Sequence, residues 1–170
     1  MNDPTRASDP VDEAGDESFP ASDPPVWTGT HAGAPQAAAR TVSGGDLVSV
    51  RCVCSVREAV ERVERAVTSA GMKVFARIDQ AAEAQAVGLA LRPATVVLFG
   101  NPRAGTPLMV ARPTAAIDLP LKALLWEDEL GAVWLTYNTP ALVVRRHGVD
   151  AALAAKLAPA GELLERAVAS

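Results

Sequence analysis

The sequence predicts an α+β domain, a two-layer sandwich in which helices pack on a mixed, mainly antiparallel sheet. Three observations predict this class. Segments with strand-like and helix-like apolar spacing alternate along residues 47–137. A short acidic turn at 127–131 joins two strands directly, which argues against a purely parallel sheet. No internal period of about 20–50 residues is present, so a solenoid or a propeller is excluded.

Residues 1–45 differ in composition from the rest of the chain. They contain seven acidic side chains against Arg6 and Arg40, together with six prolines. Few of them are large and apolar, so the entropy lost on ordering them would not be recovered by burial. We therefore predict an acidic, proline-rich disordered tail over 1–45 and a folded domain over 46–170. The folded part has 13 acidic and 14 basic residues, so the net charge of −4 belongs to the tail.

The first half of the domain predicts strand, helix, strand and helix. Apolar residues alternate along 47–54, which is typical of a strand. A Ser-x-x-Glu capping box at 55–58 then begins a helix whose valines recur at three- and four-residue spacing. A second strand follows over 72–78, and Asp79 is the predicted N-cap of a helix over 81–89.

The second half predicts a continuous apolar strand, a short helix, a hairpin and C-terminal helices. Thr106 is the predicted N-cap of the short helix and Pro107 its first residue. Pro159 interrupts the C-terminal helical region. The predicted elements are a strand over 94–99, a helix over 106–112, strands over 118–126 and 132–137, and helices over 140–147 and 149–168.

Several separated motifs make the chain resemble the bacterial DUF302 family, a domain of unknown function, over roughly 47–148. They are VFARID at 74–79, FGNP at 99–102, GTPLM at 105–109, DLPL at 118–121, WED at 126–128, YN at 137–138 and RHG at 146–148. The resemblance implies a compact α+β sandwich, a homodimer and no established activity. Similar proteins often have a His after the Asp of the second strand. This chain has Gln80 there, which argues against a metal or proton-transfer role at that position.

Turn residues gather after the strand predicted at 94–99. Such loops often carry binding sites. Glycine lets a backbone approach a ligand, and the start of a helix offers amides to an anion. Asp118 and Tyr137 would lie near one edge of an antiparallel hairpin. The candidate pocket therefore comprises Gly100, Asn101, Pro102, Gly105, Thr106, Asp118 and Tyr137. In the alternative interpretation Asn101 only caps its turn and Tyr137 only makes a buried hydrogen bond.

Metal and nucleophile motifs are sparse in this chain. Cys52 and Cys54 share a strand face but lack the other ligands of a zinc site, so two core cysteines is the favoured interpretation. Of the two histidines, His31 lies in the predicted tail and His147 follows two arginines. The chain has neither a phosphate-binding Gly-rich loop nor a Gly-x-Ser-x-Gly elbow. We therefore predict no metal site, and no cofactor is indicated.

The leading functional hypothesis is a small-molecule-binding or accessory protein. One alternative is an enzyme that uses Asp118 and Tyr137 or a thiol. Another is a protein that docks a partner through its acidic tail, using Phe19 and Trp27. Phe19 lies within, and Trp27 two residues after, a segment that resembles a Glu-Ser-Phe-Pro-Ala-Ser-Asp-Pro-Pro motif of small bacterial proteins. The charge balance gives no case for nucleic-acid binding, and no apolar run is long enough to span a membrane. Without an export signal we expect a cytoplasmic location.

Overall fold

The fold is built on a six-stranded sheet within residues 40–43 and 46–169, the part of the chain that the computed structural model describes. The strands are β1 (Arg40–Ser43), β2 (Leu47–Cys52), β3 (Lys73–Asp79), β4 (Ala94–Gly100), β5 (Leu121–Glu127) and β6 (Val133–Asn138). The helices are α1 (Val56–Ser69), α2 (Gln80–Ala86), α3 (Pro102–Ala111), η1 (Pro113–Ile117), α4 (Pro140–His147), α5 (Ala151–Ala154), η2 (Ala155–Leu157) and α6 (Ala158–Val168).

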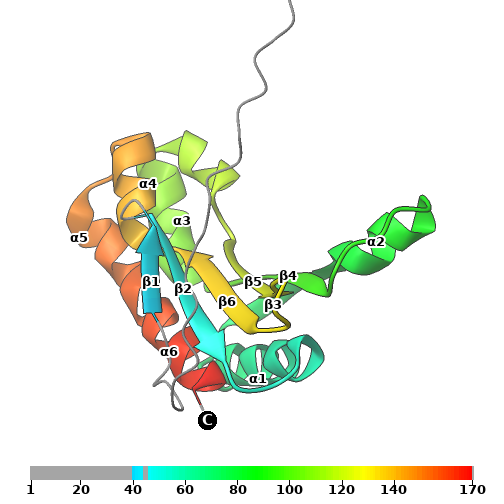
Figure 1. Ribbon diagram of the computed structural model, residues 1–170. Coiled ribbons are helices and arrows are strands. Elements are labelled where there is room, and N and C mark those ends of the chain that lie inside the picture. Colours follow the sequence, from blue (N-terminus) through cyan, green and yellow to red (C-terminus); the bar gives the residue numbers. More distant parts are fainter. Residues whose placement is uncertain (1–39, 44–45, 170) are drawn as a thin grey trace, which may run out of the picture. The chain divides into compact units, whose positions relative to one another are not determined.

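The order across the sheet is β1-β2-β6-β5-β4-β3, and each strand is antiparallel to its neighbours (Figure 1). Helices α1 and α6 pack against each other and against one face of this sheet. The α+β sandwich predicted from the sequence is therefore confirmed, with a sheet that is antiparallel at every described pairing. The predicted hairpin joins β5 to β6 and pairs Ala123 with Tyr137.

The main core lies between α1, α6 and the sheet. The valine stripe of α1 is buried, because its three- and four-residue spacing keeps Val56, Val60, Val63 and Val67 on one face. They meet inward-facing residues of the central strands, among them Val97, Leu125 and Leu135. Ser55 caps the helix as predicted, since its hydroxyl accepts a hydrogen bond from the Glu58 amide. The Glu58 carboxylate instead pairs with Arg62 at 2.8 Å, so only half of the capping box forms.

The opposite face of the sheet presents half-buried apolar and aromatic side chains. By strand alternation it includes Val96, Leu98, Leu124, Trp126 and Trp134. The two tryptophans are direct cross-strand partners, and each indole N–H has an acceptor. The Trp126 indole donates to Thr136 Oγ1 at 2.9 Å, and the Trp134 indole donates to Asp128 Oδ2 at 2.7 Å. The hydrogen bond from Trp134 to Asp128 thus connects this face to the β5–β6 turn.

The Asp128 carboxylate predicts an acid-sensitive signal. The hydrogen bond from Trp134 lowers the pKa of Asp128 below its ordinary value of 3.8. A group with a lowered pKa stabilises the fold above its ordinary pKa and loses that contribution as pH falls through the lower, folded value. We expect tryptophan fluorescence to change below about pH 3.8, and Asp128→Asn to remove that change. Glu129→Gln, on the exposed neighbour, is the matched control; identical titrations of wild type and Asp128→Asn would contradict the assignment.

A second, smaller core lies where α3, η1, α4 and the segment before α6 meet. Its buried residues are Leu108, Ala115, Val143, Val149 and Leu157. Helix α3 begins at Pro102, so the start predicted at Thr106 is wrong, and Pro107 lies inside the helix. The physical reason is that Asn101-Pro102 is itself a suitable N-cap and first-residue pair. The later pair, Thr106-Pro107, repeats that signal five residues further on.

Other elements also differ from the sequence prediction, among them β5, which begins at Leu121 and not at Asp118 because η1 occupies the residues before it. Strand β1 lies inside the segment predicted as a tail, because four residues are too few to show an alternating pattern. The rest of that segment, including Phe19 and Trp27, lies outside the described residues. Helix α2 ends at Ala86, has no buried residue and projects from the sheet (Figure 1). Strand β4 alternates between buried and half-buried positions, since only one of its faces is covered by helices.

Candidate functional site

A hollow of about 280 Å³ lies beside the start of α3. Eleven residues line it, and Asn101 is the one among them that has an amide side chain. The residues that line it are Phe75, Gly100, Asn101, Pro102, Gly105, Thr106, Met109, Leu119, Pro120, Leu121 and Leu157. No charged side chain is among them. A space of this size and lining suits a small apolar group.

Two glycines leave room for this hollow. A β-carbon on Gly105 would lie 3.6 Å from Leu119 Cδ1, an ordinary van der Waals distance. A β-carbon on Gly100 would lie 3.8 Å from both the Phe75 ring and Pro120. A larger side chain at either position would extend into space that the fold leaves open. The absence of side chains there is thus part of the shape of the hollow.

The first turn of α3 has its amide groups already engaged. Asn101 Oδ1 accepts from the Arg103 amide at 2.9 Å. The amides of Ala104 and Gly105 donate to the Asn101 carbonyl, and Pro102 has no N–H. An anion at this helix start, as the sequence suggested for Thr106, would find no free donor among these groups. The hollow therefore suits an uncharged ligand.

Five of the seven sequence-predicted pocket residues line this hollow, and two do not. Tyr137 lies on the helix-covered face of the sheet, 8% exposed, where its hydroxyl donates to Glu165 Oε1 at 2.5 Å. Asp118 lies just before the Leu119-Pro120 wall of the hollow but belongs to a separate polar cluster. Asp118 and Tyr137 therefore do not act on one ligand in this hollow.

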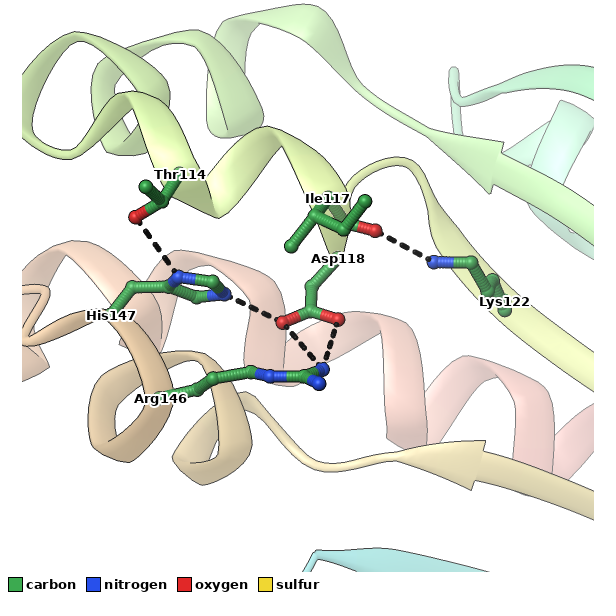
Figure 2. Close-up of polar contacts among 6 residues, drawn as sticks. All are labelled: Thr114, Ile117, Asp118, Lys122, Arg146 and His147. Carbon is green, nitrogen blue, oxygen red and sulfur yellow. Dashed lines mark hydrogen bonds and ion pairs between the residues drawn. The ribbon is translucent and has the colours of Figure 1, made fainter.

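That polar cluster joins η1 to the end of α4 (Figure 2). His147 Nε2 lies 2.6 Å from Asp118 Oδ2, and Arg146 Nη1 lies 3.0 Å from Asp118 Oδ1. On its other side, His147 Nδ1 lies 3.1 Å from Thr114 Oγ1. The side chains of His147 and Asp118 are only 5% and 9% exposed. A nearly buried histidine is thus held between a carboxylate and a hydroxyl.

Sequence reasoning missed several of these residues. Nothing in the sequence links Thr114 to His147, because they are 33 positions apart and come from different helices. The hollow also takes Met109, Leu119 and Leu157, which read as ordinary core residues. The sequence signal that could have indicated this cluster is the pair of motifs DLPL and RHG. The fold brings them into contact through Asp118 and His147.

The surroundings of the two thiols favour a structural role over a reactive one. Burial raises the pKa of Cys52 to about 12, and burial also raises the pKa of Cys54. The reactive form of a cysteine is its thiolate, which these positions disfavour. Within the described residues, no group of three His, Cys, Asp or Glu side chains is placed to hold a metal ion. Nor does any described helix have the length and apolar character required to cross a membrane.

We expect both cysteines of the folded protein to react slowly with iodoacetamide near neutral pH. Cys52 should stay unmodified until the protein unfolds, and the partly exposed Cys54 should react first but slowly. Intact mass measured over time, with a sample in denaturant as the control, gives the number of modified thiols. Rapid modification of either cysteine in the native protein would contradict this expectation and would reopen the thiol-enzyme hypothesis.

A family model and a solved structure point to the same family, and the curated relatives carry a different name. Residues 48–170 match the family model described as a domain of unknown function, DUF302. The chain is 48% identical over 103 residues to fluoride-specific ion channel FluC 1 of Brucella suis, covering 61% of this chain and 41% of that protein. FluC 2 of Brucella melitensis matches equally over 38% of its length, so the chain spans about two fifths of these curated relatives.

A solved structure shares the fold. The crystal structure of an uncharacterised conserved DUF302 protein from Bacillus stearothermophilus superimposes with a TM-score of 0.62 at 20% sequence identity. The superposition covers 72% of this chain and 94% of the other. At this identity the likeness shows a common architecture and assigns no ligand.

Proposed function

The chain belongs to the DUF302 family, and from that premise we propose that its domain binds a small, uncharged, largely apolar molecule in the hollow beside α3. The observation that carries the proposal is the lining itself: a space of about 280 Å³ with no charged side chain around it. The engaged amides of the first turn of α3 support a neutral ligand over an anion. Asn101 and Thr106 are the polar side chains available to orient it.

The proposal makes the protein a binding or accessory protein that works in the cytoplasm. Its two free cysteines suit a reducing compartment.

The homodimer expected from the family resemblance would bury the half-exposed sheet face that carries Trp126 and Trp134. Light scattering on the purified chain tests the dimer independently of any ligand.

Native mass spectrometry of the purified protein tests the binding proposal, followed by thermal-shift measurements with any co-purified molecule and a panel of neutral aromatic and aliphatic compounds. Gly105→Leu should fill the hollow and remove the shift. Ala111→Leu, at an exposed position of the same helix, is the matched control and should keep it. Equal shifts in both variants would place binding elsewhere, and no shift with any compound in the wild type would refute the proposal.

The names of the curated relatives favour a second candidate function, an accessory role beside a fluoride channel. Nearly half of the matched residues are identical in proteins named as fluoride-specific channels, of which they form about two fifths. Deleting the gene and measuring growth in sodium fluoride tests this candidate. We expect reduced tolerance that the intact gene restores; unchanged tolerance would eliminate it.

A further inference from the structure

We propose that Thr114, His147 and Asp118 form a relay in which the Thr114 hydroxyl accepts an acyl group from small activated esters. The three side chains lie in line, with the histidine ring between the other two (Figure 2). The two contacts, 3.1 Å to Thr114 and 2.6 Å to Asp118, are within the range for a nucleophile, its base and the group that orients the base. None of the three lines the hollow beside α3, so this site is separate from the proposed ligand site.

The hydrogen-bonding partners fix which ring nitrogen carries the proton. An ionised carboxylate can only accept, so His147 Nε2 must donate to Asp118. In the neutral ring, Nδ1 is then an acceptor, and the Thr114 hydroxyl is the donor that meets it. The histidine is therefore held in the tautomer that can remove the proton from Thr114.

The burial of the three groups matches these roles. The base and its orienting carboxylate are almost fully shielded from water, at 5% and 9% exposure. Arg146 contacts both oxygens of Asp118, at 3.0 and 3.4 Å, which fixes the carboxylate as a positioning group. Thr114, by contrast, is exposed, so an ester in solution can reach its hydroxyl.

The chemistry requires no further reactant except water. Thr114 Oγ1 attacks the ester carbonyl carbon, a C–O bond forms, and the hydroxyl proton moves to His147 Nδ1. The ester C–O bond then breaks, and the departing alkoxide leaves with that proton as an alcohol. Water attacks the acyl-threonine with His147 again as base, which releases the acid and restores Thr114.

The test uses the full chain with p-nitrophenyl acetate as the probe. We expect release of p-nitrophenol and one acetyl group mapped to Thr114 by peptide mass spectrometry. Thr114→Ala should slow release by about 100-fold, the usual contribution of an assisted nucleophile, and Thr114→Ser should restore it. Thr68→Ala, an exposed threonine of α1, is the matched control and should react like the wild type.

Because Thr114 is exposed, its variants keep the fold, which circular dichroism checks. The proposal is overturned if Thr114→Ala releases p-nitrophenol at the wild-type rate, or if the acetyl group maps to lysines or other surface residues and not to Thr114. In either case the cluster only fastens η1 to α4.

Discussion

Replacing Asp118 with alanine should destabilise the domain by about 1–3 kcal/mol, the usual loss when a buried hydrogen-bonding group is left without its partner. The substitution leaves the nearly buried Nε2–H of His147 without its acceptor at 2.6 Å. A buried donor without a partner has lost its hydration and gained no replacement. Arg146, which is 57% exposed, can turn to water and adds little to the loss.

Urea unfolding followed by circular dichroism measures this effect. Glu129→Ala, at an exposed acidic residue of the β5–β6 turn, is the matched control and should change stability by less than about 0.5 kcal/mol. Asp118→Asn should lie between the two, since its amide oxygen still accepts from His147. If Asp118→Ala behaves like Glu129→Ala, the cluster does not hold η1 against α4.

Local patterns in the sequence predicted most of the fold. The valine stripe of α1 and the caps Ser55 and Asp79 each depend on residues within about one or two helical turns. The hairpin was equally readable, because its acidic turn stands between two alternating segments. For such elements the deciding interactions lie within the segment itself, so the sequence displays them directly.

The candidate site depended on contacts that no local pattern contains. Two Asn/Thr-Pro pairs offered competing starts for α3, and the packing of Leu108 into the second core accompanies the earlier one. Tyr137 follows the alternation of β6 and so faces α6, where Glu165 binds its hydroxyl. Asp118 contacts His147, which is 29 positions away in the sequence, because η1 packs against α4.

Gly161→Ala should destabilise the domain by about 1–3 kcal/mol, although alanine normally stabilises a helix relative to glycine. A β-carbon at Gly161 would stand 2.9 Å from both Cε2 and the hydroxyl oxygen of Tyr137, closer than such atoms approach. The ring cannot move away freely, because Tyr137 is 8% exposed and bonded to Glu165. Helix α6 therefore shifts off the sheet or the hydrogen bond is lost.

Gly105→Ala provides the matched comparison, since both substitutions add one methyl group to a helical glycine. Its β-carbon meets Leu119 at 3.6 Å, an ordinary contact, so we expect a gain of about 0.5–1 kcal/mol. Tyr137→Leu removes the ring atoms that obstruct residue 161, so in that background Gly161→Ala should become neutral or stabilising. A loss of stability that persists in the Tyr137→Leu background would show that the clash is not with the ring. It would also mean that the close packing of α6 on β6 rests on other residues.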